Sequence, residues 1–208
     1  MTHDFDDQYW QRHWHQVRGG QPRWLLSPNP YVVDAAGGRT PGRAMDAGCG
    51  EGTEAIWLAQ QGWEVTAVDI ASTVLRRAAA RATEHGVPDV RWVGADLTVW
   101  KPDDLFELVT SHYAHPSGSQ LAFYERLARW VAPGGTLLIV GHPHHHGAGQ
   151  PRGHQPPAEA SVTAADITAH LDGTVWAVDT AAEIARAMTG RTGQQVLLND
   201  VVVRATRR

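Results

Sequence analysis

A glycine-rich stretch, Asp46-Ala47-Gly48-Cys49-Gly50-Glu51-Gly52, constrains the fold of this chain more than any other feature. It lies between a short apolar run that ends at Asp46 and a helical pattern that continues to Gln61. Glycine lets the backbone turn sharply and approach a ligand closely, and a strand that passes through such a turn into a helix is typical of nucleotide-binding α/β proteins. The stretch therefore predicts a ligand-binding turn at the end of a strand.

Short apolar runs and helical patterns alternate from Arg43 onward. This alternation is typical of a doubly wound, Rossmann-like α/β fold, with a mostly parallel sheet and helices on both faces. We expect strands at residues 43–46, 63–69, 90–94, 105–111 and 136–140, and helices at 52–61, 72–82, 119–131 and 163–171. Ser72 is expected to cap the second helix, and Pro133-Gly134-Gly135 to form a tight turn. Residues 174–178 and 195–203 predict an antiparallel strand pair at the sheet edge, joined by a long connection.

Two segments lie outside this alternation. Residues 4–17 predict an amphipathic helix, and its aromatic face carries Tyr9, Trp10, His13, Trp14 and Val17. Such a helix either packs on the body as part of the core or covers a pocket, and we assign residues 1–30 to an N-terminal helical lid or extension. Residues 142–157 are rich in Gly, Pro and His without periodicity, so they predict a surface loop.

The overall composition restricts the partners of the chain. Its 208 residues predict one domain, 1–208. With 18 Lys and Arg, a net charge of −4 and no basic block, nucleic acid is disfavoured as a partner, because phosphate binding needs a positive surface. A single cysteine allows no internal disulfide, and no apolar run is long enough to resemble a signal peptide or a membrane span. We therefore expect a cytoplasmic monomer or homodimer that does not bind membranes.

The spacing of the glycines argues against a dinucleotide. A dinucleotide-binding fingerprint would place its third glycine at position 53, where Thr53 stands. Asp46 also lies just before the first glycine, where its carboxylate would repel a pyrophosphate but accept hydrogen bonds from an ammonium group. The turn therefore favours a cofactor that carries an amino acid, and a nicotinamide-dependent oxidoreductase becomes the alternative.

Acidic residues at the ends of the next two predicted strands support a nucleoside-bearing ligand. Asp69, followed by Ile70, is placed to accept hydrogen bonds from the two ribose hydroxyls. Asp96 is placed to accept the amino group of an adenine, while Leu97 packs against the ring. The carboxyl ends of parallel strands meet at one edge of a sheet, so these residues are expected to line a single crevice.

With these motifs the chain resembles the class I S-adenosylmethionine-dependent methyltransferases, and it is similar to the small single-domain bacterial enzymes related to tellurite-resistance and thiopurine methyltransferases. The resemblance rests on the glycine-rich stretch with residues 63–69, on Phe106 to His112, and on Leu127 to Leu138 with its Pro-Gly-Gly turn, and it extends from about Tyr31 to the C-terminus. It implies a seven-stranded sheet with the last strand antiparallel. It also implies S-adenosyl-L-methionine as cofactor and a small-molecule methyl acceptor.

The same resemblance assigns contacts to individual residues. It places Asp46, Gly48 and Gly50 near the methionine part, with Ala47 and Cys49 in the same turn. Asp69 and Ile70 would bind the ribose and adenine, Asp96 and Leu97 the adenine, and Ser111 and His112 would lie near the sulfonium. Aromatic residues before the sheet cover the cofactor or substrate in such families, which makes Trp24 and Tyr31 candidates.

Histidines at the ends of the fourth and fifth predicted strands are the candidates for acceptor chemistry. His115 and His142 are predicted to touch the substrate, and one of them to take its proton, because an imidazole titrates near neutral pH. The run His144-His145-His146 with His154 invites a metal interpretation, but adjacent histidines in a loop without Cys or acidic partners rarely form a closed site. We therefore predict no metal, and we expect Cys49 to be a small buried residue rather than a nucleophile.

The acidic residues and the glycine-rich stretch are compatible with two further functions. A non-catalytic S-adenosylmethionine-binding protein would keep the same acidic residues. A methyltransferase that acts on RNA or protein is disfavoured by the charge balance, and by Ser111-His112-Tyr113-Ala114 in place of an Asn-Pro-Pro-Tyr-like signature.

Overall fold

The computed structural model describes residues 5–16, 27–143, 161–189 and 195–208, with the side chains of 188, 189, 195 and 196 left out. Trp24 and the histidines at 144–146 and 154 lie outside these residues. The helices and strands follow in the order α1 (Asp7–Gln16), α2 (Pro30–Ala36), β1 (Arg43–Ala47), α3 (Thr53–Gln60), β2 (Glu64–Asp69), α4 (Ser72–Glu84), β3 (Arg91–Gly94), β4 (Phe106–His112), α5 (Gln120–Ala128), β5 (Val131–Gly141), α6 (Ala164–Ala169), β6 (Trp176–Thr189) and β7 (Gln195–Arg207).

The sheet has seven strands in the order β3-β2-β1-β4-β5-β7-β6. Strands β1 to β5 are parallel, whereas β7 pairs antiparallel with both β5 and β6. The predicted Rossmann-like sheet with an antiparallel last strand is therefore confirmed. The order reverses between β1 and β4, and the carboxyl ends of such neighbours frame the crevice in which open α/β sheets bind ligands.

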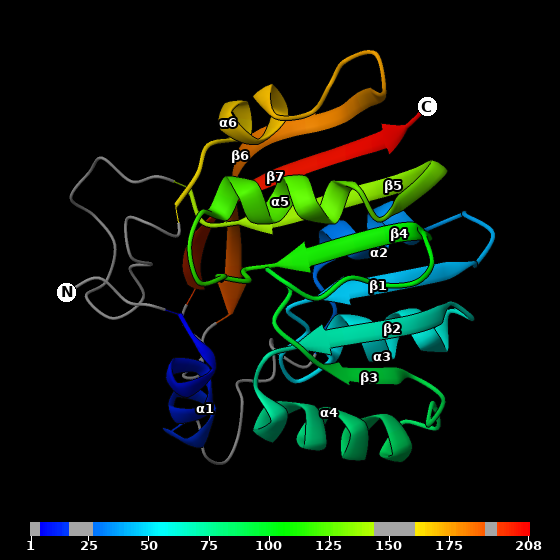
Figure 1. The fold of residues 1–208 in the computed structure, drawn as a ribbon, viewed down its shortest axis with the longest axis vertical. Helices are drawn as coiled ribbons and strands as arrows, with labels where there is room; N and C mark the ends of the chain where they lie inside the picture. The colour runs from blue at the N-terminus through cyan, green and yellow to red at the C-terminus, as the bar shows by residue number, and fades with distance from the viewer. Residues whose placement is uncertain (1–4, 17–26, 144–160, 190–194) are drawn as a thin grey trace.

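Two apolar layers hold the sheet between helices. On one face, Phe123 and Leu127 of α5 and Ile167 of α6 pack with Leu137 and Ile139 of β5. On the other face, Val32 of α2 and Leu58 of α3 pack with Leu138 and Val140. Successive residues of β5 thus alternate between the layers, and all four are at most 1% exposed, as expected for a central strand buried on both faces. Figure 1 shows α5 and α6 on the near side of the sheet, and α2 and α3 behind it.

The sequence did not lead us to expect α2. Asn29 accepts a hydrogen bond from the backbone of Tyr31, and Pro30 occupies the first helical turn. An Asn cap followed by Pro is a helix-start signal, which the short length of the helix obscured. At α4 the expected cap was misplaced by one residue, because Ala71 holds the cap position and Ser72 begins the helix.

The strands of the C-terminal half differ from the expectation at two places. The Pro-Gly-Gly segment is not a turn before the fifth strand but lies within β5, where the pairing with β4 shifts register and Gly134 has a φ of +77°. Residues expected to connect two short strands are themselves strand, since β6 continues to Thr189. Only residues 190–194 separate β6 from β7. The long ladder between β6 and β7 satisfies backbone groups that a free connection would leave to solvent.

Candidate functional site

The glycine-rich turn connects β1 to α3 and is fixed to β2 through its backbone. The N–H groups of Gly48 and Cys49 donate to the carbonyl oxygen of Val68, at 2.8 and 3.0 Å. Gly48 has a φ of +77°, and a Cβ placed there would lie 2.4 Å from the Cβ of Ala114. The turn therefore presents bare, well-anchored backbone at the carboxyl edge of the sheet.

Asp46, at the end of β1 where this turn begins, has a buried carboxyl group with one oxygen unsatisfied among the described residues. Its side chain is 1% exposed, and one oxygen accepts a hydrogen bond from the backbone of Ala55. Among the described residues, Oδ2 has no hydrogen-bond partner. Burial, and then the charge of Glu54, raise the pKa of Asp46 well above its ordinary value. A buried carboxylate with a free oxygen and a second carboxylate nearby favours a cationic ligand.

Asp69 ends β2 and joins the turn to the start of α4. Its Oδ2 accepts the N–H of Gly50 and its Oδ1 that of Ala71, both at 2.9 Å. Burial raises the pKa of Asp69, and these hydrogen bonds act in the opposite direction. Each oxygen can accept a second hydrogen bond, so the carboxylate can still bind the hydroxyls of a ribose.

The residues predicted to surround the adenine and the sulfonium also hold structural contacts. Asp96 Oδ1 accepts the N–H and the hydroxyl of Thr98, at 2.8 and 2.7 Å, which closes a local turn. Leu97 is buried in the core, while the neighbouring Ile70 at the end of β2 is partly exposed. Ser111 is buried and donates to the carbonyl of Ala47 at 2.9 Å, so it ties β4 to β1.

Four aromatic side chains form a column of rings across the carboxyl edge, which we call the ring column: Tyr113, His142, His115 and Trp10. The ring centroids are 4.8 Å apart for Tyr113 and His142, 5.4 Å for His142 and His115, and 6.4 Å for His115 and Trp10. The interplanar angles are 33°, 30° and 22°, so the rings lie roughly face to face. The structure thus brings together the two histidines that the sequence proposed for acceptor chemistry.

The histidines at this edge differ from free imidazoles. Burial lowers the pKa of His115 to about 4, and its Nδ1 has no hydrogen-bond partner in the described part of the chain. His112 shares a 2.6 Å hydrogen bond with the hydroxyl of Thr110, and burial lowers its pKa too. Both rings are therefore neutral near neutral pH, and His115 is a weak base.

A buried ion pair stands at one end of the ring column. Asp200 of β7 is 1% exposed, and its two oxygens accept hydrogen bonds from Tyr113 and from Nε of Arg186, each at 2.5 Å. A second nitrogen of Arg186 donates to the Tyr113 hydroxyl at 3.1 Å. No motif in the sequence pointed to Arg186, Asp200 or Glu54. The pair is brought together by the long β6–β7 ladder, which the sequence pattern did not reveal.

Helix α1 bridges three parts of this edge. Trp10 Nε1 donates to the carbonyl of His115 at 3.3 Å, and Gln11 hydrogen-bonds with Ser72 and with the N–H of Thr73 at the start of α4. A Cβ at Gly50 would lie 3.2 Å from the ring of Trp14. No residue of α1 is fully buried, so the helix lies on the surface over the turn instead of forming core (Figure 1).

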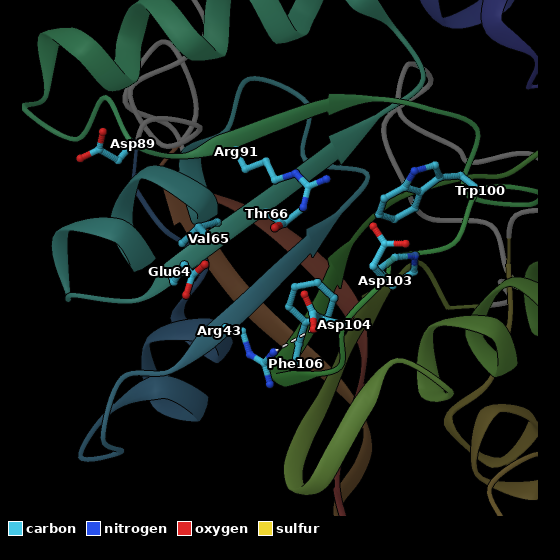
Figure 2. Close-up of a pocket in the computed structure, with 11 residues that line it drawn as sticks. Arg43, Glu64, Val65, Thr66, Asp89, Arg91, Trp100, Asp103, Asp104 and Phe106 are labelled. Atoms are coloured by element: carbon cyan, nitrogen blue, oxygen red, sulfur yellow. Dashed lines mark ion pairs between the residues drawn. The ribbon is translucent and has the colours of Figure 1, made fainter.

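A separate pocket of about 100 Å³ opens at the opposite edge of the sheet. Figure 2 shows its lining side chains, which include Arg43, Glu64, Arg91 and Trp100, near the amino ends of β1 to β4. Arg43 is already paired with Asp104 at 3.4 Å. Because open parallel sheets bind ligands at the carboxyl ends of their strands, we place the functional site at the glycine-rich turn and not in this pocket.

At the carboxyl edge, the described residues include one buried thiol and no group of metal ligands. Cys49 is buried, and burial raises the pKa of its thiol well above the ordinary value, as expected for an inert residue. Over residues 5–16, 27–143, 161–189 and 195–208, no three His, Cys, Asp or Glu side chains are grouped to hold a metal ion. In the same residues, no helix combines the length and apolar character needed to cross a bilayer.

Known proteins resemble this chain most strongly in the half that carries the turn. Residues 44–135 match the family model described as a methyltransferase domain. An uncharacterised methyltransferase of Mycobacterium tuberculosis is 41% identical over 99 residues, which are 46% of this chain and 48% of that protein. The chain thus spans about half the length of the mycobacterial relatives that it matches.

Two broader similarities cover more of the chain. A probable thiol methyltransferase of Arabidopsis thaliana is 26% identical over 160 residues, covering 74% of this chain and 68% of that protein. The structure of magnesium protoporphyrin IX methyltransferase from Synechocystis, solved with bound S-adenosylhomocysteine, superposes with a TM-score of 0.70 at 18% identity. That superposition covers 97% of each chain and supports the same fold.

Proposed function

We propose that this chain is a class I methyltransferase that transfers a methyl group from S-adenosylmethionine to a small molecule. The match of residues 44–135 to a methyltransferase domain supports this proposal. The observation that carries the proposal is the unpaired, buried oxygen of Asp46 beneath an anchored glycine turn, as seen among the described residues. The names of the thiol and protoporphyrin methyltransferases support a small-molecule acceptor.

The charges around the turn fit this cofactor. The carboxylates of Asp46, Glu54 and Asp69 lie close enough for their charges to raise the pKa of Asp46, and no cation of the described chain pairs with its free oxygen. S-adenosylmethionine has an ammonium and a sulfonium group, and when bound it supplies a methyl group activated for displacement. In the proposed complex Asp46 accepts the ammonium, and the bare backbone of Gly48 and Gly50 lies along the methionine part.

The remaining cofactor contacts follow from the ends of β2, β3 and β4. We assign the ribose hydroxyls to Asp69 and the adenine to Ile70, Asp96 and Leu97, with Asp96 using the oxygen that Thr98 leaves unused. Ser111 holds the turn in place through Ala47. His112, whose Nδ1 is buried without a partner among the described residues, lies near the sulfonium. Trp24 is a further predicted cofactor contact outside the described residues.

We assign α1 to a lid over the cofactor, in line with the lid predicted for residues 1–30, of which 1–4 and 17–26 lie outside the described residues. The support is that α1 touches the turn at Gly50, the start of α4 at Ser72 and the loop after β4 at His115, without burying any residue fully. A helix so placed excludes water from the reaction centre, which favours displacement at a sulfonium.

The acceptor is assigned to the ring column. His115 and His142 both belong to the ring column, so we expect both to contact the acceptor. Because the pKa of His115 is lowered to about 4, His115 is too weak a base to take a proton efficiently near neutral pH, and we assign any proton transfer to His142.

Replacing the two histidines tests this assignment. His142→Ala is expected to lower kcat about 100-fold if the ring acts as a base, whereas His115→Ala should mainly raise KM for the acceptor. Cofactor affinity, measured by calorimetry, should stay within about threefold in both variants. Unchanged turnover in both variants would remove the histidines from the acceptor site.

Calorimetric titration with S-adenosylhomocysteine tests the proposed function itself. Wild-type protein should bind it, and Asp69→Ala should bind at least about 100-fold more weakly, because two charge-assisted hydrogen bonds to the ribose are lost. Asp34→Ala, at an exposed carboxylate of α2, serves as the matched control. No binding by the wild-type protein would refute the proposal, and binding without transfer to any tested acceptor would favour a non-catalytic binding protein.

A further inference from the structure

The β6–β7 hairpin extends past the end of the sheet on the side of the proposed site. Gly141, the last residue of β5, pairs with Val201, so among the described strands residues 195–200 of β7 pair with β6 alone. Within this overhang Arg186 pairs with Leu198 and Ile184 with Asp200. Figure 1 shows the overhang of β6 and β7 continuing beyond the carboxyl end of β5. Two charged residues from a distant part of the chain are thereby carried to the carboxyl edge.

Within the ion pair, the guanidinium is the group most accessible to a further ligand. Both oxygens of Asp200 are used by Tyr113 and Arg186, and the Tyr113 hydroxyl donates once and accepts once. Arg186 uses Nε and one terminal nitrogen, and in the part of the chain that the structure describes no partner is seen for its other N–H groups. Its side chain is 22% exposed, against 1% for Asp200. The remaining N–H groups of Arg186 are therefore the accessible donors at this point, and a guanidinium prefers anions.

Arg186 lies near residues of both the proposed cofactor site and the ring column. The charges of Glu54, Asp200 and Arg186 all act on His112, so His112 lies near both Glu54 and the ion pair. Tyr113, held by Arg186, is also the end of the ring column. Ring faces of this kind accept flat aromatic ligands, with centroid separations similar to those seen between the side chains.

The chemistry of the column favours an acceptor that arrives ionised. His115 is a weak base, so a neutral alcohol would depend on His142 alone to lose its proton. An aromatic hydroxyl or thiol ionises readily, and a guanidinium beside it stabilises the anion.

On the basis of the proposed function, we infer that Arg186 determines the acceptor class, and that the acceptor is an aromatic hydroxyl or thiol compound bound as its anion beside Arg186 at the Tyr113 end of the ring column. The acceptor gives up its proton on binding, through His142 to solvent. Its oxygen or sulfur lone pair then forms the bond to the methyl carbon. The bond between this carbon and the cofactor sulfur breaks, and its electron pair remains on sulfur, which becomes neutral.

The test uses 4-nitrophenol and 4-nitrothiophenol, whose absorption spectra report their ionised fraction, with the protein saturated by S-adenosylhomocysteine. For at least one probe, the bound molecule should be more ionised than the free one at the same pH. Arg186→Lys keeps a cation but loses the planar fork, and it should bind the probe about tenfold more weakly. The double variant Arg186→Met, Asp200→Leu removes the pair without leaving a buried unpaired charge, and it should abolish the ionisation shift and weaken binding about 10- to 100-fold.

The controls separate recognition from folding. S-adenosylhomocysteine affinity should be unchanged in both variants, and Arg204→Met, which breaks the surface pair with Asp34, should leave probe binding and ionisation unaltered. The preferred probe distinguishes a hydroxyl from a thiol acceptor. Three outcomes would each overturn the inference. The first is that the wild-type complex binds neither probe, and the second is that a probe binds without a change in its ionised fraction. The third is that the double variant shows the same ionisation shift as wild type. If the wild-type protein fails to bind S-adenosylhomocysteine, the proposed function falls first and the inference with it.

Discussion

Replacing Asp46 by asparagine is expected to weaken S-adenosylmethionine binding about 100-fold and, at the same time, to stabilise the cofactor-free protein. The two effects have one cause. The buried carboxylate has an oxygen without a partner among the described residues, so in the absence of a cation it carries either an unpaired charge or a proton. Asparagine has a similar shape and no charge, and it can keep the hydrogen bond from Ala55.

The pH dependence of the stability change follows from the direction in which the pKa of Asp46 moves. Burial and Glu54 raise this pKa in the folded protein above its ordinary value of 3.8. Between the ordinary and the raised pKa the folded state binds more protons than the unfolded state. The free energy of unfolding therefore falls as pH rises through this range, by up to ~1.4 kcal/mol per pH unit. Above the raised pKa the full penalty persists, and Asp46→Asn should remove it.

Two measurements on the same variant check this prediction. Thermal unfolding near neutral pH should give a higher melting temperature for cofactor-free Asp46→Asn than for wild type, with the difference shrinking toward acid pH. Calorimetry should show the loss of cofactor affinity. A variant that melts at a lower temperature and still binds the cofactor normally would contradict the role given to Asp46.

Introducing a single methyl group at Gly48 is expected to destabilise the protein by about 2–5 kcal/mol. Part of this comes from the left-handed backbone, with a φ of +77°, which costs an L-residue roughly 1–2 kcal/mol. The rest comes from overlap, since the new Cβ would lie 2.4 Å from the Cβ of Ala114. The turn and the loop after β4 cannot both keep their positions.

The chain offers a closely matched control for this substitution. Gly134 has the same φ of +77°, and a Cβ there would meet nothing within 4 Å. Gly134→Ala therefore reports the backbone cost alone, and denaturant unfolding should show Gly48→Ala to be the more destabilising by about 1–3 kcal/mol. Adding Ala114→Gly to Gly48→Ala should recover most of that difference. Equal losses at both glycines would show that the loop after β4 yields freely.

The positions of the candidate cofactor residues at the carboxyl edge could be predicted because these residues stand next to local signals. Asp46 and Asp69 each end a short apolar run, and Gly48 and Gly50 mark the turn between a strand and a helix, so a few neighbouring residues define their positions. The parallel order then brings the ends together, since the carboxyl ends of β1, β2 and β4 share one edge.

The acceptor side could be predicted only in part. His115 and His142 follow strand ends and were found for that reason, but Arg186 and Asp200 meet Tyr113 across 73 and 87 positions of the chain. Their contact depends on the length of β6, where alanines at 181, 182, 185 and 187 hide the alternation of a strand. The contact of Trp14 with Gly50 likewise depends on how a surface helix docks, which periodicity does not specify.

The limited burial of α1 has a consequence for the proposed rate of turnover. The helix is held by a few polar contacts, with Gln11 at α4 and Trp10 at His115, and by the ring of Trp14 against the turn, and none of its residues is fully buried. A segment without a fully buried residue is expected to detach at a small cost in free energy compared with global unfolding. In the proposed complex the spent cofactor would leave past this helix, so the time between turnovers would depend on how often α1 detaches, and a more firmly bound helix would slow turnover while it excluded water better.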